Sequence, residues 1–203
     1  MRDVFTGRIA GMGSASGTRF VLGIWDRSPY GRFADAMIER ADGHRILVAP
    51  SDEVAAFISA TYSFDEIRIE PCTAERTADG WRVDSPSLQL AITLGARMPL
   101  GLLLRLVPRP IAIAPAWARL IAPVASRVVR GVRTVGIARE GRREYYGATD
   151  LHRVTAITGS FEDTPVGELR DVDPPCRFGF SSTPRTPSLT TVTTTVERTS
   201  GVR

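Results

Sequence analysis

The 203-residue chain contains no lysine and no asparagine, and each absence excludes a class of chemistry. A Walker-type phosphate loop needs a lysine, and Schiff-base or pyridoxal phosphate chemistry needs a lysine amine. Metal, triad and kinase sites that use an asparagine are excluded in the same way. All 26 basic residues are therefore arginines, which we interpret as the mark of a high-GC genome.

Histidine and cysteine are also scarce, with two of each in the chain. Cys72 and Cys176 lie far apart and no histidine pair accompanies them, so a zinc site of usual spacing is not expected. No cofactor motif is present, and we expect no cofactor. The first residues lack the apolar segment of a signal peptide, and no apolar run is long enough to span a bilayer. These features predict reduced, structural thiols in a cytoplasmic protein, with peripheral membrane association left open.

Acidic residues are absent from one long stretch, Ser85 to Arg139. It carries eight of the 26 arginines, while the remainder has 22 acidic against 18 basic residues. Five prolines divide it, so we expect a Pro-broken helical insertion over about residues 98–130. A helix from Pro115 to about Arg130 would place its arginines along one side of a wide apolar face.

This basic stretch has three interpretations. It is a helical layer whose arginines lie in water, a lid over an apolar cavity whose arginines receive an anionic head group, or an interfacial membrane helix. Nucleic acid is not expected as a partner, because the arginines alternate with Leu and Ala and not with aromatic stacking residues. The lid interpretation makes Trp117, Arg119 and Arg127 candidate ligand-binding residues.

The rest of the sequence predicts strands separated by turns. Asp42-Gly43 between two β-prone runs is typical of a hairpin. The Gly11–Gly17 segment lacks the spacing of a dinucleotide loop and leads into a strand. Ser51 and the two acidic residues after it predict a helix over about residues 51–62. We therefore expect a mainly β fold, a single antiparallel β barrel or curved sandwich over residues 1–197, with a frayed tail at 198–203.

The polar run from Glu144 to His152 is the most suggestive candidate site. On a regular strand, Glu144, Tyr146, Asp150 and His152 would share one face. Asp150 beside His152 is an arrangement that general-base catalysis uses, with Tyr146 and Arg143 steering a substrate. The alternative is a solvated strand face with a surface ion pair, and a bulge near Gly147 would break the shared phase.

Several segments carry a resemblance to known proteins. The runs GRIAG, SPYGRFADAMIERADGHRILVAPSDEVAAF, YYGATDLHR and RFGFSSTPR resemble a set of uncharacterised proteins from actinomycete bacteria, which implies an origin and no activity. The strand-rich pattern with one early helix is also similar to lipocalin-like barrels and to the acetoacetate decarboxylase-like fold. The catalytic lysine of that decarboxylase cannot exist here, so the likeness implies the fold alone.

Together these observations predict a protein that binds a small, largely apolar ligand in a barrel cavity, and an anionic ligand if the arginines of the basic stretch receive it. The candidate ligand-binding residues are Arg143, Glu144, Tyr146, Trp117, Arg119 and Arg127. Two alternatives stay open, an enzyme that uses His152 and Asp150 on such a ligand, and a protein of the membrane surface. The sequence does not set the oligomeric state.

Overall fold

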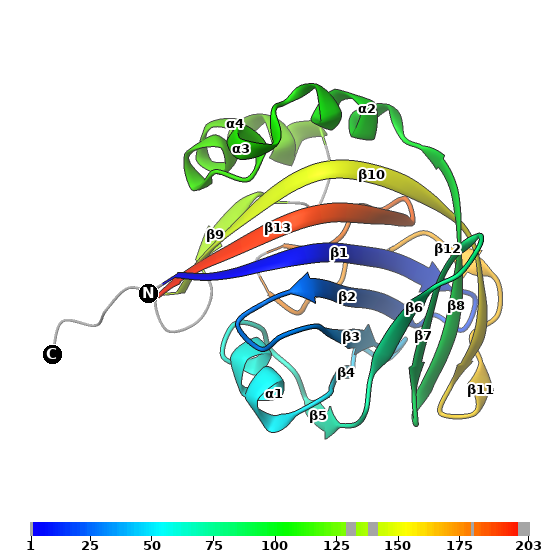
Figure 1. Ribbon diagram of the computed structural model, residues 1–203. Helices are drawn as coiled ribbons and strands as arrows, with labels where there is room; N and C mark the ends of the chain where they lie inside the picture. The colour runs from blue at the N-terminus through cyan, green and yellow to red at the C-terminus, as the bar shows by residue number, and fades with distance from the viewer. Residues whose placement is uncertain (1, 129–132, 138–141, 180, 199–203) are drawn as a thin grey trace, which may run out of the picture.

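The computed structural model describes residues 2–128, 133–137, 142–179 and 181–198 and is built around one curled sheet (Figure 1). Within these residues the sheet has 13 strands, and its main path runs β5-β4-β3-β2-β1-β13-β10-β8-β7-β6. The strands are β1 (Arg2–Ser14), β2 (Arg19–Arg27), β3 (Phe33–Glu39), β4 (Arg45–Ala49), β5 (Glu66–Ile69), β6 (Thr73–Arg76), β7 (Gly80–Ser85), β8 (Leu88–Arg97), β9 (Val135–Ile137), β10 (Arg142–Phe161), β11 (Thr164–Pro165), β12 (Leu169–Arg170) and β13 (Ser188–Arg198).

This architecture confirms the mainly β prediction and its curvature. The sheet is a half-barrel, because β5 and β6 end its path without pairing with each other in the described part of the chain. One pair departs from the predicted antiparallel order, since β4 and β5 run parallel. Helix α1 (Asp52–Ser59) joins these two strands and returns the chain to the same end of the sheet, as a parallel pair requires.

Helix α1 begins at a residue suited to cap it. The Ser51 side chain accepts a hydrogen bond from the Val54 amide at 3.4 Å, and Asp52 and Glu53 stand in the first turn. Its apolar side packs on the sheet, where the Phe57 ring lies 4.9 Å from that of Phe5. The helix is four residues shorter than the 51–62 segment expected from the sequence.

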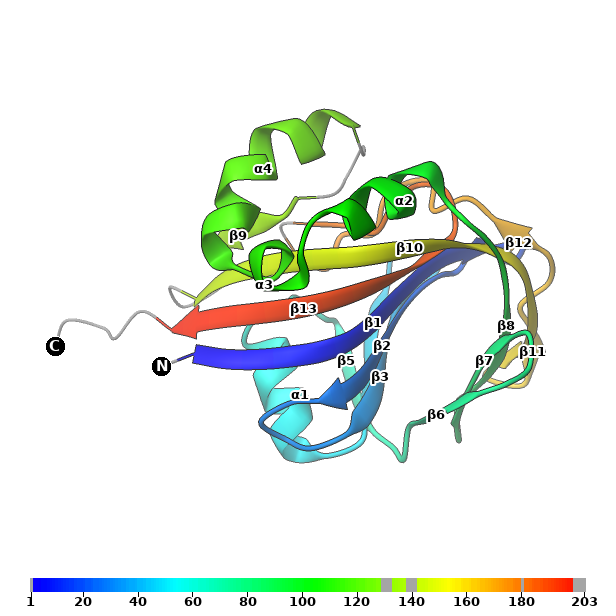
Figure 2. The same cartoon turned by 45° about the horizontal axis from the view of Figure 1, so that its top comes forward.

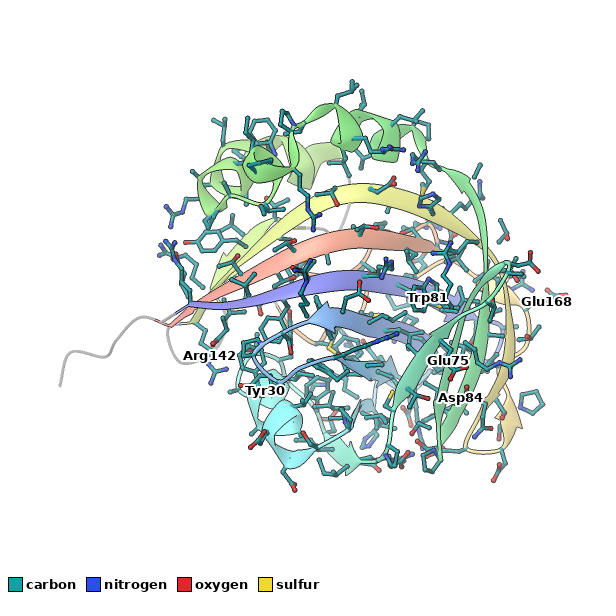
Figure 3. All side chains as sticks on the ribbon, in the orientation of Figure 1. Tyr30, Glu75, Trp81, Asp84, Arg142 and Glu168 are labelled. Atoms are coloured by element: carbon teal, nitrogen blue, oxygen red, sulfur yellow. The ribbon has the colours of Figure 1, made fainter. Side chains whose placement is uncertain are left out.

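Arg142 and Tyr30 contact Phe57 near the C-terminal end of α1. Arg142 donates a hydrogen bond from Nη1 to the Phe57 carbonyl at 3.2 Å, and its guanidinium lies 5.3 Å from the Phe57 ring. The Tyr30 ring lies 5.4 Å from the same ring. Figure 3 labels Arg142 and Tyr30 at the end of the sheet beside this helix.

The predicted helical insertion forms three helices, α2 (Pro99–Leu106), α3 (Arg109–Ala112) and α4 (Pro115–Val128). Proline opens α2 and α4, and Pro108 precedes α3, so the prolines divide the segment as expected. All three helices pack against β10, and Figure 2 shows them on the outer side of that strand. No described helix is long and apolar enough to cross a membrane. The predicted domain limits, 1–197 with a tail from 198, stay a prediction.

The two faces of the sheet carry separate hydrophobic clusters. On β4, Ile46 and Val48 belong to one cluster, while Leu47 and Ala49 belong to the other. The first cluster fills the inside of the curl, where β7, β8 and the second half of β10 face β1 to β4. The second cluster lies under α1 and borders a cavity.

Candidate functional site

A cavity of about 190 Å³ lies on the α1 side of the sheet. Its floor comes from β3, β2, β1, β13 and the first half of β10, and its sides come from α1, α2 and residues 176–179 and 181–184. Most of the lining is apolar. The aromatic part comprises Phe5, Trp25, Phe33, Phe57, Tyr62, Tyr146 and Phe178. Polar groups enter this lining at only a few places.

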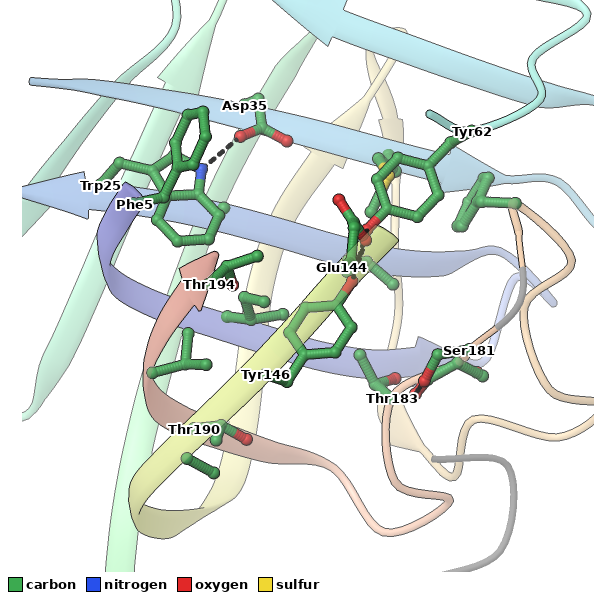
Figure 4. A pocket seen from close by; sticks show the side chains of 18 of the residues that line it. Phe5, Trp25, Asp35, Tyr62, Glu144, Tyr146, Ser181, Thr183, Thr190 and Thr194 are labelled. Atoms are coloured by element: carbon green, nitrogen blue, oxygen red, sulfur yellow. Dashed lines mark hydrogen bonds between the residues drawn. The ribbon is translucent and has the colours of Figure 1, made fainter. Parts of the chain in front are cut away.

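Asp35 on β3 is the first of these polar groups. Its side chain is buried, and it accepts one hydrogen bond, at 2.9 Å, from the indole nitrogen of Trp25 on β2 (Figure 4). Burial raises the pKa of Asp35 to about 6, and the Trp25 bond opposes that rise. Gly23 makes the pair possible, because a Cβ there would lie 2.2 Å from Oδ1 of Asp35 and 2.6 Å from the indole nitrogen.

Glu144 on β10 is the second buried carboxyl and sits between two tyrosines (Figure 4). Tyr62, just after α1, donates to its Oε2 at 2.7 Å, and Tyr146 donates to the same atom at 3.0 Å. The two tyrosine hydroxyls also contact each other. Burial raises the pKa of Glu144, although both tyrosine bonds oppose the rise. Burial and the neighbouring Glu144 charge raise the pKa of each tyrosine well above its usual value.

Serine and threonine side chains add further polar groups to the lining, from Thr134, Ser181, Ser182, Thr183, Thr190 and Thr194. The Oγ1 atoms of Thr183 and Thr194 are buried, and no hydrogen-bond partner is found for either among the described residues. Both residues line the cavity (Figure 4). Thr183 reaches the sheet because β1 has Gly11 there, where a Cβ would lie 2.2 Å from its hydroxyl oxygen. A buried hydroxyl without a hydrogen bond costs free energy. A ligand group that bonds to either hydroxyl would therefore gain the most binding free energy at these positions.

The site therefore combines an apolar, aromatic interior with two carboxyls, two tyrosines and two unpaired hydroxyls. Burial raises the pKa of both carboxyls, and a carboxyl that holds its proton can donate as well as accept a hydrogen bond. No group of three or more metal-ligating side chains occurs in the described ranges. Such a lining suits a small organic ligand with one or two polar groups.

A bulge in β10 separates the residues of the predicted polar face. The pairing of β10 with β13 shifts register between Ala148 and Asp150, so Thr149 is an extra residue. Before the bulge, Glu144 and Tyr146 line the cavity, as does Ala148. After it, Leu151 lines the cavity, and the side chains of Asp150 and His152 fall on the opposite face.

The expected single face is therefore wrong from Asp150 onward. Asp150 instead forms an ion pair with Arg97, at 2.8 Å, and this pair holds the pKa of the carboxyl below its usual value against the effect of its partial burial. His152 is half-buried and stands opposite Leu189 and Arg97 in the sheet. A general-base role for these two residues in the cavity has no support from this geometry.

The arginines expected at the cavity are located elsewhere. Arg119 on α4 donates to the Tyr145 hydroxyl and lies 3.8 Å from Glu197. Tyr145 faces away from the cavity, as does the exposed Arg143. Trp117 is half-buried on α4 and does not line the cavity, and the side chain of Arg127 lies outside the described part of the protein. No arginine is present in the described lining.

Three residues of the site were not predicted from the sequence. These residues are Trp25, Asp35 and Tyr62. Asp35 carried a usable signal, because it is the one charged residue in the apolar run Phe33–Ile38. A lone carboxyl in a buried strand needs a partner or a function.

Comparison with known proteins shows a likeness to solved structures. The chain aligns with the crystal structure of acetoacetate decarboxylase from Legionella pneumophila, with a TM-score of 0.39 and 8% sequence identity. The alignment covers 96% of this chain and 82% of that one. No protein-family model matches the sequence, and no curated protein matches it. A likeness at this level says nothing about activity.

Proposed function

We propose that this protein binds a small, largely apolar ligand in the cavity between the sheet and α1. The observation that carries the proposal is the mainly apolar lining with a few convergent polar groups, the usual composition of a small-molecule site. Engineered apolar cavities of about 150 Å³ accept benzene, so the volume here suits a ligand of about one aromatic ring and a polar group. The aromatic rings of Phe5, Trp25 and Phe33 would supply most of the contact area.

The polar lining indicates the charge that such a ligand carries. Asp35 and Glu144 are both acidic, and the described lining contains no arginine to offset them. A carboxylate brought into this low-dielectric space would repel these carboxyls or force them to stay protonated. A hydroxyl or an amine, by contrast, can hydrogen-bond to them and to Thr194. We therefore favour a neutral or basic ligand over the anionic one that the arginine-rich segment had suggested.

Three probes of one shape test this proposal. Benzyl alcohol, benzylamine and benzoate share a ring and differ in charge. The indole N–H of Trp25, assigned with Trp25→Phe, reports directly on the cavity because it is bonded to Asp35. We expect benzyl alcohol and benzylamine to shift this resonance in a saturable way, and benzoate to bind at least about tenfold more weakly.

A cavity-filling variant identifies where the probes bind. Ala148→Phe places a ring in the cavity from β10 and should abolish the shifts. Thr158→Phe adds the same ring at an exposed position of the same strand and should leave them intact. Failure of all three probes to bind the folded wild type would disprove the proposal. Equal binding to the wild type and to Ala148→Phe would show that the probes occupy another place.

A further inference from the structure

Helix α2 presents leucines in two opposite directions. Leu100 and Leu104 line the cavity, and Gly101 lets the helix lie against the β10 backbone at Leu151. On the other side, Leu102, Leu103 and Leu106 are 56%, 62% and 79% exposed. These three side chains fall within about 100° of one another on a helical wheel. A soluble helix normally turns such a face toward the core, so these leucines lack the cover that apolar faces usually have.

The next two helices also carry exposed apolar side chains. Ile111 on α3 is 48% exposed and Leu120 on α4 is 70% exposed. Five of the eight large apolar side chains exposed in the described residues therefore belong to this one segment. Figures 1 and 2 both show α2, α3 and α4 together on the outer side of β10. We call these five residues, with Arg105 and Arg109, the leucine–arginine face.

The charge of this face is of one sign. Arg105 and Arg109 are exposed, and neither forms an ion pair with an acidic side chain of the described residues. No aspartate or glutamate occurs anywhere between residues 85 and 139. Asp150 and Glu197, from the neighbouring strands, are paired with Arg97 and Arg119, so little unpaired negative charge beside these helices would oppose an anionic surface.

We propose that the leucine–arginine face docks on an anionic phospholipid membrane. The exposed leucines enter the boundary between head groups and acyl chains, and the two guanidinium groups bind lipid phosphates beside them. A second copy of the chain fits this face less well, because a symmetric interface would bring the same arginines together without a carboxylate between them.

The position of α2 connects this surface with the cavity. One side of the helix contacts the proposed bilayer through Leu102, Leu103 and Leu106, and the other side borders the cavity through Leu100 and Leu104. A largely apolar ligand would then exchange between the membrane and the cavity past this helix, a consequence that rests on the proposed function. Docking itself does not depend on the cavity.

Vesicle flotation of the full chain tests the docking. We expect the protein to float with phosphatidylcholine vesicles that contain phosphatidylglycerol, and to remain unbound with pure phosphatidylcholine. Arg105→Gln/Arg109→Gln should weaken binding about fivefold for each arginine removed. Leu102→Ser/Leu103→Ser/Leu106→Ser should weaken it by more than about tenfold through lost apolar burial.

Matched variants elsewhere on the surface control for charge and exposure. Arg82→Gln/Arg153→Gln removes two exposed arginines, and Ile67→Ser/Ile69→Ser removes two isoleucines that are 47% and 45% exposed. Both variants should float like the wild type. Equal loss of binding in these controls, or no flotation of the wild type, would overturn the docking.

Two further readouts separate the remaining explanations. Circular dichroism of each variant verifies its fold, and the substituted positions are exposed, so folding should be retained. A wild-type dimer in gel filtration that the leucine variant converts to a monomer would assign the face to self-association instead. Absent flotation with an intact benzyl alcohol shift at Trp25 would disprove docking and leave the proposed function standing.

Discussion

Asp35 places its carboxyl in an apolar wall, where a single indole N–H is the only hydrogen-bond donor to it among the described residues. Its ordinary pKa is 3.8, and burial raises the value to about 6 in the folded protein. Between these two values the folded state binds a proton that the unfolded state has released. The free energy of unfolding contributed by this group therefore decreases as the pH rises through that window.

Comparison of the wild type with Asp35→Asn isolates this contribution. The asparagine stays neutral and can still accept from Trp25. Relative to the variant, we expect the wild type to lose roughly 3 kcal/mol of unfolding free energy between pH 4 and pH 7, since two pKa units correspond to about that amount. Chemical denaturation of both proteins across this range measures it. A difference in unfolding free energy between the two proteins that does not change with pH would contradict the burial of the charge.

At the same scale, the sequence singled out two residues that line the cavity, and their role in ligand binding stays a prediction. Glu144 and Tyr146 were found because two-residue alternation holds up to Ala148. Asp150 and His152 were misplaced because one extra residue, Thr149, reverses the alternation. A bulge of this kind has no firm sequence signal, since Thr suits a regular strand equally well.

At the scale of elements, α1 forms the wall of the cavity opposite the sheet, through Phe57 and Ile58. It has only eight residues, so its stability depends on packing and on its cap. Ser51 supplies that cap through the Val54 amide. A looser α1 would widen the cavity and weaken contact with a ligand.

Ser51→Ala should therefore cost about 1 kcal/mol of unfolding free energy, the usual contribution of a serine cap. The same variant should bind benzyl alcohol more weakly at the Trp25 indole. Urea denaturation and the indole titration measure the two effects. Ser59→Ala, at the partly exposed last residue of α1, should stay within about 0.5 kcal/mol of the wild type. Equal stability of the two variants would show that the cap does not hold α1.

The sequence predicted which segments form helices and hairpins better than it predicted which strands pair with each other. The Ser51 cap, the Asp42-Gly43 turn and the prolines of the insertion located helices and hairpins correctly, because these signals are local. The parallel pairing of β4 and β5 was missed, because it depends on how α1 crosses the sheet. Pairing over long distances follows from packing that a single sequence does not display.

For the whole molecule, the same distinction explains why the curvature of the sheet was predictable and most of the residues that line the cavity were not. A long, β-rich chain must curl or be covered to protect its edges. The cavity lining, however, joins residues from Phe5 to Val196, and the same apolar side chains would serve equally well as a filled core. Only the curl of the sheet and the position of α1 show which of them border a space.

Acidic and basic residues are unevenly distributed along the chain. This distribution gives membrane docking and ligand binding different dependences on salt concentration. All 22 acidic residues lie outside the stretch from 85 to 139, and docking draws on the arginines inside it. Raising the salt concentration shortens the range of electrostatic attraction, from about 10 Å at 0.1 M to about 3 Å at 1 M. Burial of a neutral ligand in an apolar cavity has no such dependence.

We therefore expect the higher salt concentration to release the protein from phosphatidylglycerol vesicles while benzyl alcohol continues to bind. Flotation and the Trp25 indole titration, run in the same two buffers, measure the two responses. Arg105→Gln/Arg109→Gln should show a smaller salt effect on flotation than the wild type, because it has less charge to screen. Flotation that is unchanged by salt would place docking on the leucines alone and refute the role of the arginines.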